Sequence, residues 1–499
     1  SLATVIIALR FYHASVTGYI LPDEAYYYNT YILAKRVEYR RWLFQLVFQL
    51  FFNDVRDISN FLLRGATYCT IWAFGSVIVA YKIVRRLVVQ EITAALLMLS
   101  LSLFPIFIVM VPLIITEGFA LFLALVGILF VMKYLDRSRP FDGLFASLAF
   151  LMASLVREHY FLFTIGNLMV IPLSRRKNVS GLIAYCVPLL AVLFYLAYPG
   201  TLARAQIMAI VGSFQRSAKI DDIYAFAIGL IYGYNPLFTA FLFASLGLVT
   251  YEAAARRSRM ATVILVNMVL ALMSYLFSLF VIVGSLSAAV TAWTSSIIRV
   301  SHTSLPSMFG FRYLYERIKP RNLIAVVLVF LLLATTQIPR FEYAIQRSLT
   351  RTGELIDRLS FDYMAPYFRV YLLAKDSGKT LVIGGLHMRG IVTYMSMLPN
   401  VVVVGLQKKP GVFLAEEEFR SLLEKQWDTI FLYDDWYTIK DPTIAYAYPL
   451  YYRNILLTRT YPGFNLEVLW IDGESYAMKM VKTNASASTD SETNLISLS

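Results

Sequence analysis

The chain has 499 residues, of which 58% are hydrophobic and only 15% are charged, and its formal net charge is +13. Soluble domains are usually about 45–50% apolar, so the composition excludes an ordinary soluble protein. The positive charge does not indicate nucleic-acid binding, because the basic residues stand at the ends of apolar blocks, where they orient a chain in a membrane. The sequence therefore predicts a polytopic α-helical membrane protein.

The chain opens with nine mostly apolar residues, SLATVIIAL, followed by Arg10. Nine helical residues rise only about 13 Å, too little to cross a bilayer, so we expect that the first helix either begins upstream of this sequence or was processed. The stretch LPDEAYYYNT then places Asp23 and Glu24 in a first outer loop, residues 21–61. Within it, residues 26–53 combine aromatic and basic side chains, which predicts helices lying in the membrane interface.

Ten further apolar blocks follow, and with the first helix they predict about eleven spans. The blocks are 62–84, 91–114, 118–134, 141–156, 160–174, 180–198, 235–254, 261–283, 290–311 and 323–339. Every second junction between them is basic, which places those junctions on the cytoplasmic face. The other junctions then face outward, and an odd number of spans puts the C-terminus outside.

The composition changes after the membrane domain, residues 1–339. KTLVIGG, NVVVVGL, DTIFLYDD and NLEVLWI are short β-rich runs, whereas GIVTYMSML and AEEEFRSLLEKQ have helical patterns. This alternation predicts an extracytoplasmic α/β domain over residues 340–482. The last residues, 483–499, are rich in Ser and Thr and predict a disordered tail.

Ionisable residues gather at the predicted outer junctions. They are Asp23, Glu24, Glu117, Arg157, Glu158, His159, Arg299 and His302. Such groups are costly at membrane depth and tend to mark a functional site. Because they stand at the ends of several helices on one face, we expect them to line one cavity that is open to the lipid and to the outer medium.

Each of these residues also has a simpler interpretation. The Asp23/Glu24 pair could begin a solvated loop or cap a helix, and Glu117 could mark a short hairpin. Arg157 could belong to an ion pair that closes a tight turn, and Arg299 could be an interface anchor. These alternatives stay open for each residue alone, and only the clustering on one face favours a site.

The sequence also resembles a known family. ALRFYHASVTGYILPDEAYYYNTYILAKR is similar to the opening of the GT-C glycosyltransferases that use lipid-phosphate sugars, such as the protein O-mannosyltransferases and the lipid A aminoarabinose transferases. Arg10, Asp23 and Glu24 match features of that opening. ITEGFALFLALVGILFVMKYLD, LASLVREHYFLFTIGNLMVIPL and RVSHTSLPSM resemble later parts of the family, so the likeness covers most of residues 1–340 in outline.

The resemblance implies a GT-C-like membrane domain and an inverting glycosyltransferase. Its donor would be a sugar on a polyprenyl or dolichyl phosphate, and its acceptor a hydroxyl of a glycan, lipid or protein at the outer face of a bacterial or archaeal plasma membrane. The implied roles are catalysis for Asp23 and Glu24, binding of the donor phosphate for Arg157, Arg299, His159 and His302, and binding of the acceptor or of a divalent metal for Glu117 and Glu158. No residue spacing indicates a metal.

Two other classes of protein remain open. A transporter or flippase for lipid-linked sugars would also place ionisable residues in the membrane. Such proteins often show internal repeats and broken helices, whereas this sequence shows no convincing repeat and its acids cluster at one face. A non-catalytic envelope scaffold would use its outer domain to bind a partner, and it would keep its function without the Asp23/Glu24 pair.

Overall fold

The computed structural model describes residues 2–18, 20, 22–36, 41–88, 90–102, 111–157, 160–173, 179–197, 236–282, 365–385, 389–409, 412–434, 448–471 and 475–483. Contacts along the chain form two units, which are described separately. The helical unit comprises Ser1–Tyr12, Lys35–Asn53 and Leu62–Ile356; the α/β unit comprises His13–Ala34, Asp54–Phe61 and Asp357–Ser499. Two segments of the first outer loop thus belong with the C-terminal part of the chain.

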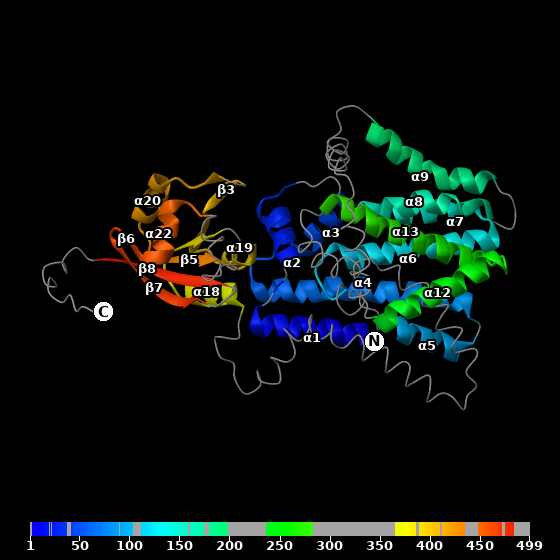
Figure 1. Ribbon diagram of the computed structural model, residues 1–499, viewed down its shortest axis with the longest axis horizontal. Helices are drawn as coiled ribbons and strands as arrows, with labels where there is room; N and C mark the ends of the chain where they lie inside the picture. The colour runs from blue at the N-terminus through cyan, green and yellow to red at the C-terminus, as the bar shows by residue number, and fades with distance from the viewer. Residues whose placement is uncertain are drawn as a thin grey trace. The chain divides into compact units, whose positions relative to one another are not determined.

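The helical unit consists of apolar helices (Figure 1). In the described ranges they are α1 (Leu2–Thr17, which ends in the α/β unit), α3 (Trp42–Phe52), α4 (Ile58–Leu87, which begins there), α5 (Glu91–Ser102), α6 (Thr116–Arg137), α7 (Pro140–Ser154), α8 (Phe161–Leu168), α9 (Val179–Ala197), α12 (Pro236–Ala254) and α13 (Arg259–Ile282). Among the described helices, α4 and α6 are long and apolar enough to cross a membrane. Their 30 and 22 residues correspond to about 45 and 33 Å.

The predicted blocks from 62–84 to 261–283 each contain one of these helices. The last two blocks, 290–311 and 323–339, lie outside the described residues, so the number of spans stays a prediction. One block differs from its prediction, because residues 111–115 form turns rather than the end of a helix. Pro112 stands among them, and proline lacks the N–H that a helix interior needs.

Close packing joins α6 to α7. The chain reverses at Ser138, which adopts the left-handed conformation (φ 55°) and donates its N–H to the carbonyl of Tyr134. Pro140 then begins α7, where its fixed φ suits a first helical position. At Gly127 of α6, the ring of Phe150 from α7 lies only 2.7 Å from the place a Cβ would occupy, so a larger residue would push the two helices apart.

A pair of buried amides joins α8 to α13. Asn167 donates its Nδ2 to Oδ1 of Asn267 at 3.0 Å, and Asn267 returns the bond at 3.1 Å. Each Nδ2 also donates to a carbonyl one turn earlier in its own helix, that of Phe163 or of Val263. Both donors of each amide are therefore used, which removes the cost of burying them among apolar helices.

The α/β unit contains a six-stranded mixed sheet with the order β2-β1-β5-β8-β7-β6. Its strands are β1 (Thr380–Gly384), β2 (Val401–Gly405), β5 (Thr429–Asp434), β6 (Thr460–Tyr461), β7 (Phe464–Ile471) and β8 (Tyr476–Lys482). β2, β1 and β5 run parallel, whereas β8, β7 and β6 continue the sheet in antiparallel fashion. A separate hairpin pairs β3 (Gln407–Lys409) with β4 (Val412–Phe413).

Helices of the same unit accompany this sheet (Figure 1). They are α18 (Pro366–Lys375), α19 (Arg389–Met395), α20 (Glu416–Glu424) and α22 (Leu450–Thr458), together with α2 (Pro22–Tyr27) and the π-helix η1 (Tyr28–Leu33) from the first outer loop. Apolar side chains of α20 and α22 fill a core with the strands, in which Phe419, Tyr452 and Tyr476 are fully buried. The predicted βαβ arrangement is present in β1, α19 and β2, and all four predicted strands form.

Candidate functional site

The acid pair, Asp23 and Glu24, lies in the first turn of α2. Carboxylates are favourable there, because aligned peptide dipoles give the N-terminus of a helix partial positive charge. Glu24 is fully buried, whereas Asp23 is partly exposed. A fully buried Glu24 does not fit the start of a solvated loop.

The segment that carries the acid pair is bonded to the C-terminal part of the same unit. The hydroxyl of Tyr367 on α18 bonds to the backbone of Ile20, and the hydroxyls of Thr393 and Tyr394 on α19 bond to Asn29 and to the backbone of Gly18. These partners lie on both sides of the acid pair in the sequence. The placement of Asp23 and Glu24 therefore depends on residues more than 340 positions away.

An ion pair joins two other predicted site residues in the helical unit. Nη2 of Arg157 lies 3.3 Å from Oε1 of Glu117, and the second carboxylate oxygen of Glu117 accepts a hydrogen bond from Oγ1 of Thr116 at 2.9 Å. The side chain of Glu117 is 5% exposed and that of Arg157 is 17% exposed. Little water screens such a pair, so its charges interact more strongly than a surface pair would.

The helices around this ion pair fix both partners. Glu117 lies in the first turn of α6, and the carbonyl of Ile115, just before the helix, accepts a hydrogen bond from the hydroxyl of Tyr68 on α4 at 3.2 Å. Arg157 lies in the turn that follows α7, where its N–H donates to the carbonyl of Ala153 at 2.8 Å. The turn closes when Tyr160 donates its N–H to the carbonyl of Arg157 at 3.1 Å. The ion pair agrees with the simpler interpretation of Arg157, and the role of Arg157 toward a phosphate stays a prediction.

Four predicted site residues lie outside the described residues. They are Glu158, His159, Arg299 and His302. Their assignments stay predictions.

The described residues do not fit a divalent metal. In the described ranges, no three His, Cys, Asp or Glu side chains come together as a metal-binding group. Both oxygens of Glu117 already have partners, a guanidinium and a hydroxyl, and a carboxylate paired with a cation is a poor ligand for a second one. We therefore derive no catalytic step through a metal.

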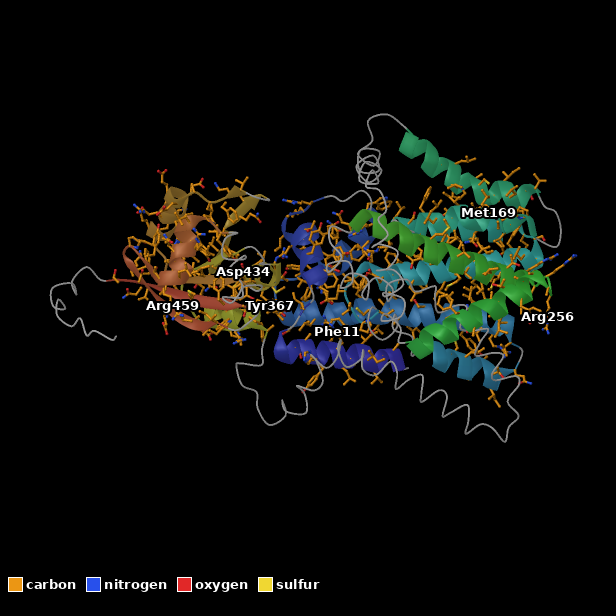
Figure 2. The ribbon with its side chains drawn as sticks, viewed as in Figure 1. Phe11, Met169, Arg256, Tyr367, Asp434 and Arg459 are labelled. Atoms are coloured by element: carbon orange, nitrogen blue, oxygen red, sulfur yellow. The ribbon has the colours of Figure 1, made fainter. Side chains whose placement is uncertain are left out.

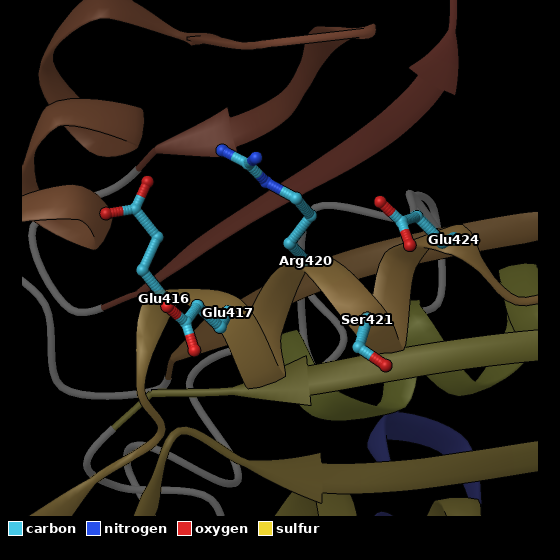
Figure 3. A pocket seen from close by; sticks show the side chains of 5 residues that line it. All are labelled: Glu416, Glu417, Arg420, Ser421 and Glu424. Atoms are coloured by element: carbon cyan, nitrogen blue, oxygen red, sulfur yellow. The ribbon is translucent and has the colours of Figure 1, made fainter.

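A hollow of about 430 Å³ on the surface of α20 carries a group of charged side chains (Figure 3). It is lined by Glu416, Glu417, Arg420, Ser421 and Glu424. All five side chains are exposed and come from one helix, whose other face buries Phe419 and Leu423. This is the solvated face of an amphipathic helix, and it provides no buried polar group that a ligand would need.

Sequence reasoning missed the residues that hold these predicted site residues in place. Thr116, Tyr68, Tyr367, Thr393 and Tyr394 are ordinary hydroxyl residues in apolar or aromatic stretches, and nothing in their spacing sets them apart. Only Thr116 had a usable signal, because it directly precedes a predicted site acid. The others act through contacts between distant parts of the chain, which a single sequence does not reveal.

The fold places the chain among known structures. Its fold is similar to that of two solved crystal structures over nearly its whole length. The crystal structure of ArnT from Cupriavidus metallidurans bound to undecaprenyl phosphate shares 13% sequence identity with it, at a TM-score of 0.54, over 95% of this chain and 96% of that one. The apo structure of the same protein gives 13% identity and a TM-score of 0.53, over 96% and 97%. No known protein family and no curated protein matches the sequence.

Proposed function

We propose that the protein is a membrane glycosyltransferase that takes a sugar from a polyprenyl-phosphate donor and transfers it to an acceptor hydroxyl at the outer face of the membrane. The observation that carries this proposal is the similarity of nearly the whole chain to an ArnT structure that holds undecaprenyl phosphate. ArnT is a lipid A aminoarabinose transferase of the GT-C superfamily. Asp23 of the acid pair and Arg157 of the ion pair are the residues to which the proposal assigns the base and the phosphate ligand.

Asp23 is the proposed general base. Its carboxylate takes the proton of the acceptor hydroxyl while the hydroxyl oxygen attacks the anomeric carbon of the sugar. The new carbon–oxygen bond forms as the bond from that carbon to the phosphate oxygen breaks, and polyprenyl phosphate leaves. A single displacement inverts the configuration at the anomeric carbon. Asp23 suits this role better than Glu24, because Asp23 is partly exposed and Glu24 is fully buried.

Arg157 is the proposed ligand of the donor phosphate. A guanidinium presents paired N–H donors that match phosphate oxygens, and positive charge is needed where the leaving phosphate gains charge. The ion pair with Glu117 uses Nη2 of Arg157 and fixes the plane of the guanidinium. Arg299, His159 and His302 are proposed as further phosphate ligands, and Glu24 and Glu158 as groups that orient the acceptor.

The membrane interface is the proposed place of reaction. On α3, Trp42, Leu46 and Leu50 are exposed along one side of the helix, whereas Phe44 and Phe48 on another side are buried. A helix with an apolar exposed side and an aromatic residue at its start suits the boundary between headgroups and acyl chains. A bacterial inner membrane, with a long-chain polyprenyl phosphate, is the proposed setting.

The fate of the donor distinguishes the proposed transferase from the rival function, a transporter for lipid-linked sugar. The purified protein is placed in liposomes with a donor whose sugar is radiolabelled, and the lipid products are resolved by chromatography. A transferase releases free polyprenyl phosphate when an acceptor is present, whereas a transporter leaves the donor intact. An intact donor with each acceptor class, glycan, lipid and protein, would contradict the proposed function.

A further inference from the structure

We propose that the C-terminal α/β domain positions the acid pair through three hydroxyl side chains, those of Tyr367, Thr393 and Tyr394, which we call the hydroxyl clamp. The proposal rests on the proposed function in one respect, namely that Asp23 acts in the transfer. The proposal gives the C-terminal domain a role in the transfer itself, which is to hold the acid pair in place. The clamp residues are positioning residues, because they bond to the segment around the acids and not to substrate.

The first contact of the clamp lies before the acid pair. The backbone N–H of Ile20 donates to the hydroxyl of Tyr367 at 2.7 Å, and the same hydroxyl donates to the carbonyl of Ile20 at 3.0 Å. Tyr367, labelled in Figure 2, thus satisfies both backbone groups of one buried residue. Buried backbone groups need such partners, so the contact fixes the chain three residues ahead of Asp23.

The second contact fixes the end of α1. Gly18 has φ +68°, donates its N–H to the carbonyl of Ala14, and accepts a hydrogen bond on its own carbonyl from the hydroxyl of Tyr394. The ring of Phe368 fills the space beside it, 2.1 Å from the place of a Cβ. Only glycine combines this left-handed backbone with so close a ring.

The third contact lies after the acid pair. Oγ1 of Thr393 bonds to Oδ1 of Asn29 at 3.0 Å, and it lies 3.5 Å from the carbonyl oxygen of Ala25, the residue that follows Glu24. The hydroxyl clamp therefore holds the chain on both sides of Asp23 and Glu24. The local sequence cannot do so alone, because α2 has only six residues and helices that short are unstable in isolation.

Aromatic packing and a cation–π contact within the α/β unit support the residues of the hydroxyl clamp. The rings of Tyr367, Phe368 and Tyr371 surround that of Tyr394 at centroid distances of 5.4–5.7 Å. The guanidinium of Arg369, on the same helix α18, lies 4.5 Å above the ring of Trp470 on β7. This contact joins α18 to the sheet. Residues on packed helices and strands hold a site in place more precisely than residues on a loop do.

The other part of the outer loop also meets α18. Burial and the nearby carboxylate of Asp57 raise the pKa of Tyr371. Asp57 immediately precedes α4 and accepts a hydrogen bond from the N–H of Asn60 at 2.7 Å. Asp57, near the end of the outer loop, is therefore close enough to α18 to affect Tyr371.

The test removes only the hydroxyls. Tyr367→Phe, Thr393→Val and Tyr394→Phe are made singly and together in the full chain, and hydrogen exchange of residues 18–33 is compared with the wild type. Tyr451→Phe is the matched control, because its hydroxyl donates to the carbonyl of Leu414 at 2.8 Å in the same unit. In the triple variant we expect amides of the segment, Ile20 foremost, to exchange about tenfold faster or more, with no change in the control.

Transfer kinetics provide the second readout. We expect kcat of the triple variant to fall about tenfold or more while the donor KM stays within about twofold, because displacement of a reacting group affects turnover more than binding. Unchanged exchange in residues 18–33 would overturn the clamp, and faster exchange with wild-type kcat would overturn its positioning role. The exchange measurement needs no turnover, so it tests whether the clamp holds residues 18–33 even if the wild type transfers no sugar. Absence of transfer by the wild type would count against the proposed function alone.

Discussion

Nη2 of Arg157 lies 3.3 Å from Oε1 of Glu117, and this ion pair joins two residues to which the sequence assigned different roles. Glu117 was expected to bind acceptor or metal, and Arg157 the donor phosphate. In the structure the acid instead holds the arginine. A partly buried guanidinium beside a carboxylate carries less uncompensated charge when no donor is bound.

The first prediction concerns this ion pair. Arg157→Gln should lower the free energy of unfolding by about 3–5 kcal/mol, because it leaves the carboxylate of Glu117 buried without its cation. The double variant Glu117→Gln/Arg157→Gln should recover part of that loss yet remain inactive, since no guanidinium remains for the phosphate. Thermal unfolding in detergent and transfer assays measure both effects.

The control for this prediction is an exposed ion pair. Arg256 lies 2.7 Å from Glu252, and its side chain is 61% exposed. Arg256→Gln should therefore cost about 1 kcal/mol or less. Recovery of transfer in the Glu117→Gln/Arg157→Gln variant would show that Arg157 serves stability alone.

The second prediction concerns the amide pair between α8 and α13. Asn167→Leu should destabilise the protein by about 1–2 kcal/mol, because the amide of Asn267 loses its partner while it stays buried. Asn267→Leu should do the same from the other side. The double variant should be more stable than the sum of the two losses predicts, since no polar group is left alone. Strictly additive losses in a double-mutant cycle would mean that the amides do not support each other.

The third prediction concerns pH. The Nζ of Lys408, at 2.6 Å, and the backbone N–H of Ala415, at 3.1 Å, donate to Glu418 and lower its pKa from the ordinary 4.5. Because the folded pKa lies below the unfolded one, the stabilisation is present above about pH 4.5 and is lost as the pH falls through the lowered pKa. Glu418→Gln should therefore weaken the exchange protection of α20 near pH 7, and its effect should shrink as the pH falls below about 4.5 and through the lowered pKa.

Glu417→Gln is the control for the pH experiment. It removes the same charge from the same first turn of α20, but the hydrogen bonds of Lys408 go to Glu418. Its effect should be smaller near pH 7. Equal effects of the two substitutions at neutral pH would assign the protection to the helix dipole and not to the bond with Lys408.

Much of the fold could be predicted because its signals are local. Runs of β-branched residues such as Val401–Gly405 form strands wherever a sheet accepts them, and apolar blocks such as 118–134 form helices. The apolar composition predicted a helical block over 91–114, yet residues 111–115, with Pro112 among them, form turns. Apolar composition predicts that this stretch is buried, but it does not predict where turns replace helix.

The site was predictable residue by residue but not as an arrangement. The cost of charge in an apolar chain singled out Asp23, Glu24, Glu117 and Arg157. Their partners could not be found this way, since Thr393 and Asn29 stand 364 residues apart and neither is unusual where it stands. A hydroxyl in an aromatic helix has no sequence signal until the fold supplies its partner.

The proposed role of Asp23 as base has one direct measurement. Purified Asp23→Asn is assayed for donor binding and for release of free polyprenyl phosphate, beside Asp54→Asn, which changes an exposed acid of the same outer loop. We expect Asp23→Asn to bind the lipid-linked donor like the wild type and to release no lipid phosphate, while Asp54→Asn stays active. Near-normal release by Asp23→Asn would contradict the assignment of Asp23 as the catalytic base.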